Sequence, residues 1–153
     1  MRFVIQCVSS AQVDVEGETV GKIGKGFLVL VGISDSDDES TADTMVKKML
    51  GLRVFEDSEG KTNLNLESVG GSLLIISQFT LYADCRKGNR PSFIKAGAPD
   101  HAERLYRYIL SRVRERFPDT GEGVFGAYMK VSLVNEGPFT VILDSDELLR
   151  NRK

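Results

Sequence analysis

Short apolar runs separated by turn residues dominate the start of the chain. The runs with the length and composition of strands are residues 3–8, 11–15, 18–23 and 27–33. The links between them are short and two contain glycine, so we expect antiparallel neighbours. The same reasoning predicts further strands at residues 53–56, 72–77, 129–134 and 139–143.

Two longer stretches repeat their apolar residues at helical spacing. We expect a first helix at 37–52, where Ser36 and Glu39 fit a capping box. A second helix is expected at 100–117, with Asp100 at a capping position. Mostly antiparallel strands with two principal helices predict an α+β fold, built on a curled sheet or small β-barrel.

Composition agrees with an ordinary globular protein, expected to form one domain over residues 1–153. No apolar run approaches the roughly 20 residues that cross a bilayer, and the first residues do not resemble a signal peptide. We therefore expect no membrane partner. The two cysteines, Cys7 and Cys85, are too few for a disulfide scaffold and fit a reducing cytoplasm. Cys7 lies in an apolar strand, and we interpret it as a small buried residue rather than a nucleophile.

Charge and missing residue types exclude several classes of protein. A net charge of −2 argues against a protein that coats nucleic acid, although an enzyme that grips only the tip of an RNA needs few positive charges. The only histidine is His101, at the start of an expected helix, so a Ser-His-Asp site would depend on it alone. No metal cluster, phosphate loop or dinucleotide fingerprint is present, and we expect no cofactor and no metal ion.

One candidate site lies where the apolar strand at 72–77 ends in polar residues. Ser77 and Thr80 offer hydroxyls, Gln78 offers an amide, and a turning backbone there could expose consecutive N–H groups. Such donors can form an oxyanion hole for acyl transfer. Serine and threonine at a strand end can also simply satisfy backbone groups, and residue types alone favour this second interpretation.

Two further segments complete the candidate chemistry. Residues 85–95 carry four positive charges in a chain that is acidic overall, which indicates an anionic substrate such as a phosphate. Phe93, in the same segment, could stack on a base, although anchoring of the loop is the favoured interpretation. Residues 135–140 (NEGPFT) place a proline between two strands, and spacing alone predicts a hairpin turn there.

Taken together, these segments resemble the D-aminoacyl-tRNA deacylase family. Residues 77–81 (SQFTL) resemble its first signature, and residues 135–140 resemble its second, usually written NxGPVT. Residues 86–91 (RKGNRP) and 125–129 (FGAYM) are also similar to family stretches. The resemblance covers essentially the whole chain in order and length.

The resemblance implies a cytoplasmic homodimer that hydrolyses the ester of D-aminoacyl-tRNA, and of glycyl-tRNA mischarged on tRNA(Ala). In the family the Gly-Pro bond is cis, and the pair reaches into the active site of the partner subunit. Carried over, Gly137 and Pro138 form a chiral gate that leaves no room for an L side chain. Such a gate works by exclusion, so achiral glycine is accepted together with D residues.

The resemblance also assigns roles within the site. The backbone amides of Phe79 and Thr80 face the ester carbonyl, while Ser77 and Gln78 shape the pocket. The 2′-OH of the terminal adenosine assists the attack, so no strong protein base is required. Thr80 as a nucleophile ranks lower, because no base stands near it in sequence.

The implied contacts with the acceptor 3′ end of the tRNA involve four further residues. Phe125 and Met129 lie near the terminal adenine, and Arg86 and Lys87 belong to the same tRNA-binding set.

Two positions depart from the family pattern. Family members commonly carry arginine where this chain has Cys7, and that arginine is thought to hold the Gly-Pro motif. Phe139 replaces the usual valine of the second signature and adds bulk beside the gate. A related animal branch has a trans Gly-Pro bond and edits tRNA mischarged with L-alanine; it is an outside alternative, because residues 77–81 match the D-specific signature in full.

Two other functions remain open at this stage. The protein could be a small-ester hydrolase that uses Ser77 or Thr80 as nucleophile, which predicts turnover of simple esters. It could also be a dimeric RNA- or ligand-binding module without catalysis, although its low positive charge counts against RNA binding as the whole function.

Overall fold

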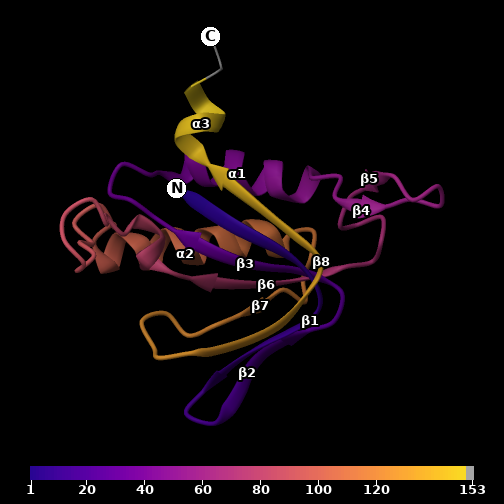
Figure 1. The fold of residues 1–153 in the computed structure, drawn as a ribbon, viewed down its shortest axis with the longest axis horizontal. Helices are drawn as coiled ribbons and strands as arrows, with labels where there is room; N and C mark the ends of the chain where they lie inside the picture. Colours follow the sequence, from indigo (N-terminus) through magenta and orange to yellow (C-terminus); the bar gives the residue numbers. More distant parts are fainter. Residues whose placement is uncertain (151–153) are drawn as a thin grey trace.

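A strongly curled sheet of six strands forms the framework of the molecule (Figure 1). The computed structural model describes residues 1–150. The elements in chain order are β1 (Arg2–Val15), β2 (Glu18–Ile23), β3 (Gly26–Gly32), α1 (Glu39–Gly51), β4 (Phe55–Glu56), β5 (Thr62–Leu64), β6 (Ser72–Ser77), the 3-10 helix η1 (Phe79–Tyr82), α2 (Pro99–Arg114), β7 (Gly121–Glu122), β8 (Lys130–Asp144) and α3 (Ser145–Arg150).

The strand order is β2-β1-β3-β6-β7, and β8 pairs with β1. As predicted, β1 is antiparallel to its neighbours β2 and β3. The pairs β3–β6 and β6–β7 are parallel, which short-link reasoning did not anticipate. The cause is connection length: α1 lies between β3 and β6, and α2 lies between β6 and β7, so each connection is long enough for a crossover.

The predicted strands at 3–8 and 11–15 are one strand, β1, and the break expected between them is wrong. The residues between the two runs, Ser9 and Ser10, are exposed, and the pairing of β1 with β8 shifts register around them. The polar interruption therefore marks an irregularity within a continuous strand. Figure 1 shows β1 and β8 bending together at this end of the sheet.

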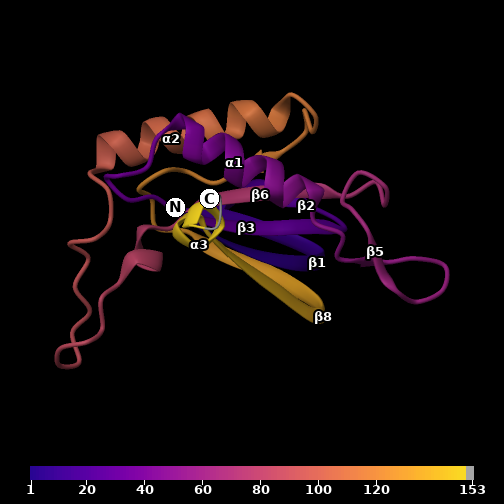
Figure 2. The same cartoon turned by 90° about the horizontal axis from the view of Figure 1, so that it is seen from above.

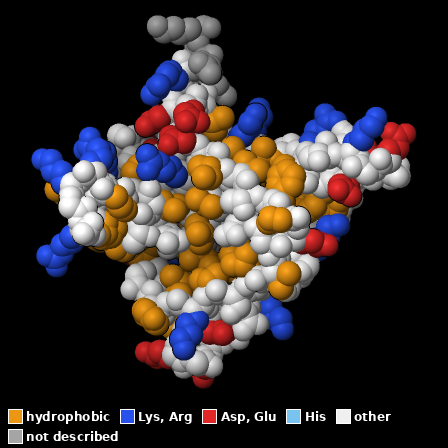
Figure 3. All heavy atoms as spheres, viewed as in Figure 1, with side chains coloured by type: hydrophobic (Ala, Val, Ile, Leu, Met, Phe, Trp, Pro, Cys, Tyr) orange, Lys and Arg blue, Asp and Glu red, His pale blue; other side chains and the backbone are white. Residues whose placement is uncertain are grey.

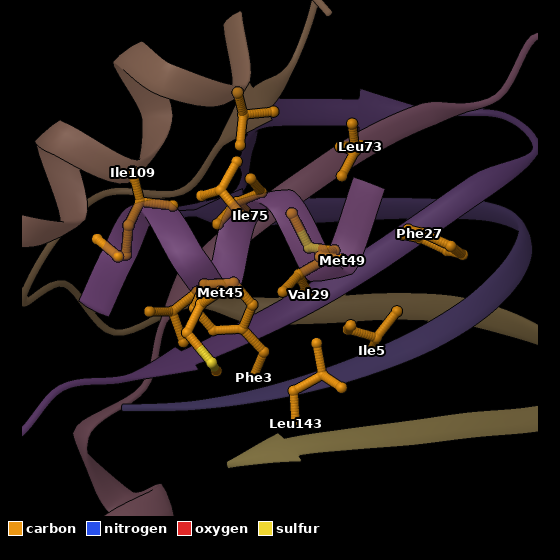
Figure 4. Close-up of a cluster of buried hydrophobic side chains, with 14 of the residues drawn as sticks. Phe3, Ile5, Phe27, Val29, Met45, Met49, Leu73, Ile75, Ile109 and Leu143 are labelled. Carbon is orange, nitrogen blue, oxygen red and sulfur yellow. The ribbon is translucent and has the colours of Figure 1, made fainter. Parts of the chain in front are cut away.

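Each face of the sheet packs against its own apolar cluster. Helices α1 and α2 both cover one face (Figure 2), where Met45, Met49 and Ile109 meet Phe3, Val29 and Ile75 (Figure 4). On the opposite side the curled strands pack on one another, and Leu74 and Ile76 belong to this second cluster. Because β6 is buried on both faces, its sequence reads as a continuous apolar run rather than an alternating one.

The acidic residues before α1 have separate structural tasks. Asp38, not Ser36, caps α1 by accepting a hydrogen bond from the Thr41 N–H, and this bond lowers the pKa of the Asp38 carboxyl. The predicted capping box is therefore wrong. Asp37 is buried, and its carboxylate accepts a hydrogen bond from the N-terminal ammonium group of Met1 at 2.8 Å. Asp35 accepts a hydrogen bond from the N–H of Ala98.

The second helix also begins differently from the prediction. Its N-cap is Ala98, which has no side-chain cap, and Pro99 is its first residue, so Asp100 lies inside the first turn. The carboxylate of Asp35 accepts a hydrogen bond from the N–H of Ala98 at the start of the helix. Because Asp35 is distant in sequence, a local pattern cannot reveal this contact. A third helix, α3, was not predicted because it is less than two turns long. Within residues 1–150, no helix has both the length and the apolarity to cross a membrane.

Candidate active site

The polar end of β6 turns into η1 and leaves backbone N–H groups without acceptors inside the helix. Strand β6 ends at Ser77, and the Gln78 N–H donates the last sheet bond, to the Val31 carbonyl, at 2.8 Å. In a 3-10 helix the first N–H groups have no acceptor within the helix. Those of Phe79 and Thr80 are therefore available to a ligand. We refer to residues 77–80 as the amide turn.

The side chains of the amide turn bond to each other. The Gln78 amide donates to the Thr80 hydroxyl oxygen at 2.9 Å. No carboxylate or imidazole among the described residues is bonded to that hydroxyl. The arrangement supplies neutral hydrogen-bond donors and no general base for a nucleophile.

Arg2 fixes the position of η1. Its guanidinium donates to the Leu81 carbonyl at 2.8 Å, lies 4.6 Å from the centre of the Tyr82 ring, and pairs with Asp144 at 3.0 Å. Burial, followed by the nearby Asp37 carboxylate, raises the pKa of Tyr82 to about 12. Sequence reasoning missed Arg2, because a single arginine at the start of an apolar strand carries no distinctive signal.

Gly32 lets η1 approach β3 closely. A Cβ at Gly32 would lie 2.9 Å from the Cβ of Leu81, closer than side-chain atoms tolerate. The glycine is therefore required by packing against the helix, and together with Arg2 it holds the amide turn on the end of the sheet.

A long loop carrying the positive charges begins beside the amide turn. Asp84 and Ser92 close it by exchanging two backbone hydrogen bonds, of 2.7 and 2.9 Å. We call residues 84–95 the basic arm. At its base the ring of Phe93 meets the ring of Phe79 edge to face, with centroids 5.1 Å apart. Phe93 thus anchors the arm to the amide turn.

Two of the four cations of the basic arm are held by Asp84. Its carboxylate accepts a hydrogen bond from the Arg86 guanidinium at 2.7 Å and lies 3.7 Å from the ammonium group of Lys95. Hydrogen bonds from Arg86 are the main reason that the pKa of Asp84 lies well below its usual range. Arg86 and Lys87 were both predicted to bind the tRNA end. Arg86 is engaged within the arm, whereas Lys87 is exposed at its tip.

The loop before β8 approaches the same end of β6. A Cβ on Gly123 would lie 2.7 Å from the sulfur of Met129 and 3.7 Å from the side chain of Ile76, so Met129 lies beside the residue that precedes Ser77. Phe125 packs against Tyr106, with ring centroids 6.2 Å apart. Met129 therefore neighbours the final residues of β6, and Phe125 is connected to them through Tyr106, whose hydroxyl donates to the Ile75 carbonyl at 2.6 Å. Whether they bind adenine stays a prediction.

The second signature is a bulge within β8 and not the predicted hairpin turn. Thr140 pairs with Gln6, and Asn135 pairs with Val8, so the chain on both sides of the motif pairs with β1 instead of with itself. The extra residues 136–139 loop out; we call them the Gly-Pro bulge. The Gly137–Pro138 peptide bond is cis, as the resemblance implies.

Asn135 holds the base of the Gly-Pro bulge. Its side-chain oxygen accepts the Phe139 N–H at 2.7 Å, and its amide nitrogen donates to Gln6 at 3.1 Å and to Thr140 at 3.0 Å. These three bonds span both sides of the bulge and tie it to β1. The motif itself contained this residue, but its role could not be derived from spacing.

Cys7 lies behind the bulge, beside a cavity of about 300 Å³ whose lining includes Lys25, Gly137 and Phe139. As predicted, Cys7 is buried, and burial raises the pKa of its thiol to about 11. The thiol is therefore protonated at neutral pH and unsuited to act as a nucleophile.

Within one chain the amide turn and the Gly-Pro bulge lie at opposite ends of the sheet. Ser77 is aligned with Val31, which pairs with Phe3, whereas Asn135 pairs with Val8. Five positions along β1 correspond to about 16 Å at ~3.3 Å per residue. Figure 1 shows the end of β6 and the bend of β8 on opposite sides. One copy cannot bring the two motifs together.

The fold and the site define a small curled-sheet protein with a backbone-amide site at one end of the sheet and a cis-proline bulge at the other. The family model described as D-Tyr-tRNA(Tyr) deacylase matches residues 4–144. The chain belongs to this family.

Named relatives and solved structures agree with this membership. The chain is 54% identical to a D-aminoacyl-tRNA deacylase of Solibacter usitatus over 100% of both chains. It is 50% identical to one of Thermosipho melanesiensis, covering 97% of this chain and 99% of the relative. A solved structure titled c-Myc DNA Unwinding Element Binding Protein superposes with a TM-score of 0.89 at 41% identity, covering 94% of this chain and 98% of that one. A probable eukaryotic D-amino acid tRNA deacylase, 21% identical with a TM-score of 0.81 and the same coverage, shares the fold.

Proposed function

We propose that this protein hydrolyses the ester bond of D-aminoacyl-tRNA, releasing the free D-amino acid and the tRNA. The observation that carries the proposal is the amide turn, whose N–H groups without an acceptor in the helix lie at the end of β6, in residues that resemble the first signature of the family. Aminoacyl-tRNA is used in translation, so we place the reaction in the cytoplasm.

The chemistry suits a site without a strong base. Water attacks the ester carbonyl carbon, the bond to the ribose oxygen breaks, and that oxygen takes up a proton. The N–H groups of Phe79 and Thr80 donate to the oxygen that becomes negative during the attack, which stabilises the transition state. The neighbouring 2′-OH of the terminal adenosine assists the proton transfer, while Ser77 and Gln78 shape the pocket. The Thr80 hydroxyl, bonded among residues 1–150 to an amide alone, is not the nucleophile.

A second copy of the chain completes this site in the proposal. Because the amide turn and the Gly-Pro bulge are about 16 Å apart along β1, the bulge can serve as a gate only for a partner's amide turn. A two-fold interface would bring each bulge to the other subunit's amide turn. Exposed apolar residues on β8, including Val134 at 55% and Ile142 at 67%, support such an interface, and Figure 3 shows apolar side chains gathered on this face.

The gate determines which enantiomer of the amino acid the enzyme accepts. Backbone atoms of Gly137 and Pro138 meet the α-amino group and occupy the space that an L side chain would need. Rejection is steric, so we propose that glycyl-tRNA, including glycine mischarged on tRNA(Ala), is a substrate as well.

The test is deacylation of D-tyrosyl-tRNA, L-tyrosyl-tRNA and glycyl-tRNA by the purified protein, side by side. We expect rapid loss of the D and glycyl esters and no loss of the L ester. Pro138→Ala should relax this selectivity or abolish activity, whereas Pro118→Ala, an exposed proline after α2, serves as the matched control. Unchanged rates and selectivity in Pro138→Ala would contradict the gate.

Further measurements on the same purified protein separate the alternative functions. Hydrolysis of simple esters that depends on Ser77 or Thr80 would identify a small-ester hydrolase. Binding of tRNA without hydrolysis of any of the three esters would identify a binding module. A monomer with full activity, measured by analytical ultracentrifugation at the assay concentration, would contradict the shared site.

A further inference from the structure

The basic arm stands apart from the rest of the molecule. Figure 2 shows the chain between η1 and α2 extending away from the sheet and the helices. The arm is nevertheless ordered by contacts at its base, where Asp84 and Ser92 exchange backbone hydrogen bonds and Phe93 packs on Phe79. From Asp84 to the tip at Gly88 the chain can reach up to about 13 Å. A ligand bound at the amide turn can therefore be followed outward by the arm.

Two cations at the tip of the arm are not neutralised. Asp84 pairs with Arg86 and Lys95, but Lys87 and Arg90 have no acidic partner within 4.0 Å among residues 1–150. Both are exposed. Two unpaired positive charges at the tip of an ordered arm form a small site for an anion.

Two arginines of α2 are less available to an anion. Arg107 pairs with Glu122 at 3.3 Å and with Glu103 at 3.8 Å, and Arg114 pairs with Glu122 at 3.3 Å, so these two arginines face two carboxylates. Arg104 has no acidic partner within 4.0 Å among residues 1–150 and bonds to His101 instead. The arm differs from α2 because two unpaired cations lie in one loop that begins beside the amide turn.

Two exposed aromatic rings lie at the base of the arm, Phe79 in the amide turn itself and Phe93 in the arm. Phe79 is 56% exposed and Phe93 is 37% exposed, although the two rings contact each other. An exposed ring pair beside cations is the combination that binds single-stranded nucleic acid, where bases stack on aromatic faces and phosphates pair with cations.

We propose that the basic arm binds the unpaired nucleotides that precede the terminal adenosine of the tRNA 3′ end. One base stacks on the Phe79–Phe93 pair, and the phosphates that follow bind Lys87 and Arg90. Asp84 positions the arm by closing it and by holding Arg86 and Lys95. The inference rests on the proposed function for the location of the terminal adenosine, and it adds a second subsite that recognises RNA independently of the amino acid.

Two substrates separate this subsite from the catalytic one. D-tyrosyl-tRNA carries the preceding nucleotides, whereas D-tyrosyl-adenosine, esterified on the ribose of a single nucleoside, lacks them. The double variant Lys87→Ala/Arg90→Ala should raise KM for the tRNA about 10-fold with kcat unchanged, which is an order-of-magnitude expectation for two lost phosphate contacts. Its kinetics on D-tyrosyl-adenosine should match those of the unmodified protein. The matched control is Lys47→Ala/Lys48→Ala, which removes the same charge from the exposed face of α1.

The stacking step has its own pair of variants. Phe93→Ala should weaken binding of uncharged tRNA by roughly 5- to 150-fold, the range measured for one stacked base. Phe93→Tyr retains the ring and should restore binding. The salt dependence supplies a further readout, since two single-strand phosphate contacts contribute a slope of about −1.4 to log K against log salt. That contribution should disappear in the Lys87→Ala/Arg90→Ala variant.

Three results would overturn the arm site. These are equal losses on D-tyrosyl-tRNA and D-tyrosyl-adenosine, a double variant no weaker than the α1 control, or a lower oligomeric mass of the double variant, which would place the arm in a protein interface. If the unmodified protein hydrolysed neither substrate, the proposed function would fail. Binding of uncharged tRNA would still decide the arm site, because that measurement requires no catalysis.

Discussion

Asn135 is the side chain on which the geometry of the Gly-Pro bulge depends most directly. Asn135→Ala removes an acceptor from the Phe139 N–H and two donor bonds, to Gln6 and Thr140. A net hydrogen bond contributes about 0.5–1.5 kcal/mol, so three partly exposed bonds together contribute roughly 2 kcal/mol, in the lower part of the summed range. If this energy holds the bulge in its observed position, its loss raises the released population about 30-fold.

The consequence should appear in selectivity before it appears in rate. A released gate no longer excludes an L side chain, so deacylation of L-tyrosyl-tRNA by Asn135→Ala should rise about 30-fold, in proportion to the released population. D-tyrosyl-tRNA should still be hydrolysed, because the amide turn belongs to the other end of the sheet. The assay compares kcat/KM for both esters, with circular dichroism to establish that the variant is folded.

Asn65→Ala is the matched control for this prediction. Asn65 also accepts hydrogen bonds through its side chain, from the N–H and the hydroxyl of Ser68, but in an exposed turn before β6. It should leave selectivity unchanged. A folded Asn135→Ala variant with the unmodified D/L ratio would refute the assignment of the side chain as the support of the gate.

The remaining predictions concern the nucleophile, the thiols and the buried ion pair. Thr80→Ala should keep kcat/KM within about 10-fold of the unmodified protein, since it removes one neutral hydrogen bond; complete loss in a folded variant would instead favour a threonine nucleophile. At about pH 8, iodoacetamide should modify the exposed Cys85 and spare Cys7, because burial keeps the Cys7 thiol inaccessible and its raised pKa keeps it protonated. Mass spectrometry of the protein labelled in its native state measures modification at both sites. Asp37→Asn breaks the buried pair with the N-terminal ammonium and should lower the free energy of unfolding by about 3–5 kcal/mol. Urea denaturation measures this loss against the control Asp38→Asn, which retains a good helix cap. Equal losses of stability in the two variants would contradict the role of the ion pair.

Most elements could be predicted from the sequence because burial leaves a periodic signature. Strand β6 and helix α2 are buried along a face or throughout, and their apolar patterns follow that burial. Partner choice leaves no comparable signature. Nothing in the run at 72–77 indicates that β6 pairs in parallel with β3, because that depends on the path of the intervening helix α1. The division of β1 at Ser9 failed for a related reason, since polar residues can mark an irregularity as well as an end.

The candidate site was less accessible to residue-level reasoning than the fold. Every residue except proline carries a backbone N–H, so residue types at 77–80 cannot reveal which donors lack an acceptor. The turn into η1 determines that, and it depends on Arg2 and Gly32, which are distant in sequence. The Gly-Pro bulge shows the same limit. Its residues read as a hairpin turn until the pairing of both flanks with β1 is known.

The net charge of −2 was the main objection to an RNA substrate, and the distribution of ion pairs answers it. Arg107 and Arg114 are paired with Glu103 and Glu122, so this part of the α2 surface offers little net attraction for phosphate. Unpaired charge on the basic arm lies at Lys87 and Arg90, at the tip of a loop that begins beside the amide turn. A deacylase that gripped many phosphates would be occupied by uncharged and correctly charged tRNA, because those molecules present the same backbone. A short electrostatic footprint keeps affinity for all tRNA low and leaves discrimination to the pocket, where the D ester differs from the L ester.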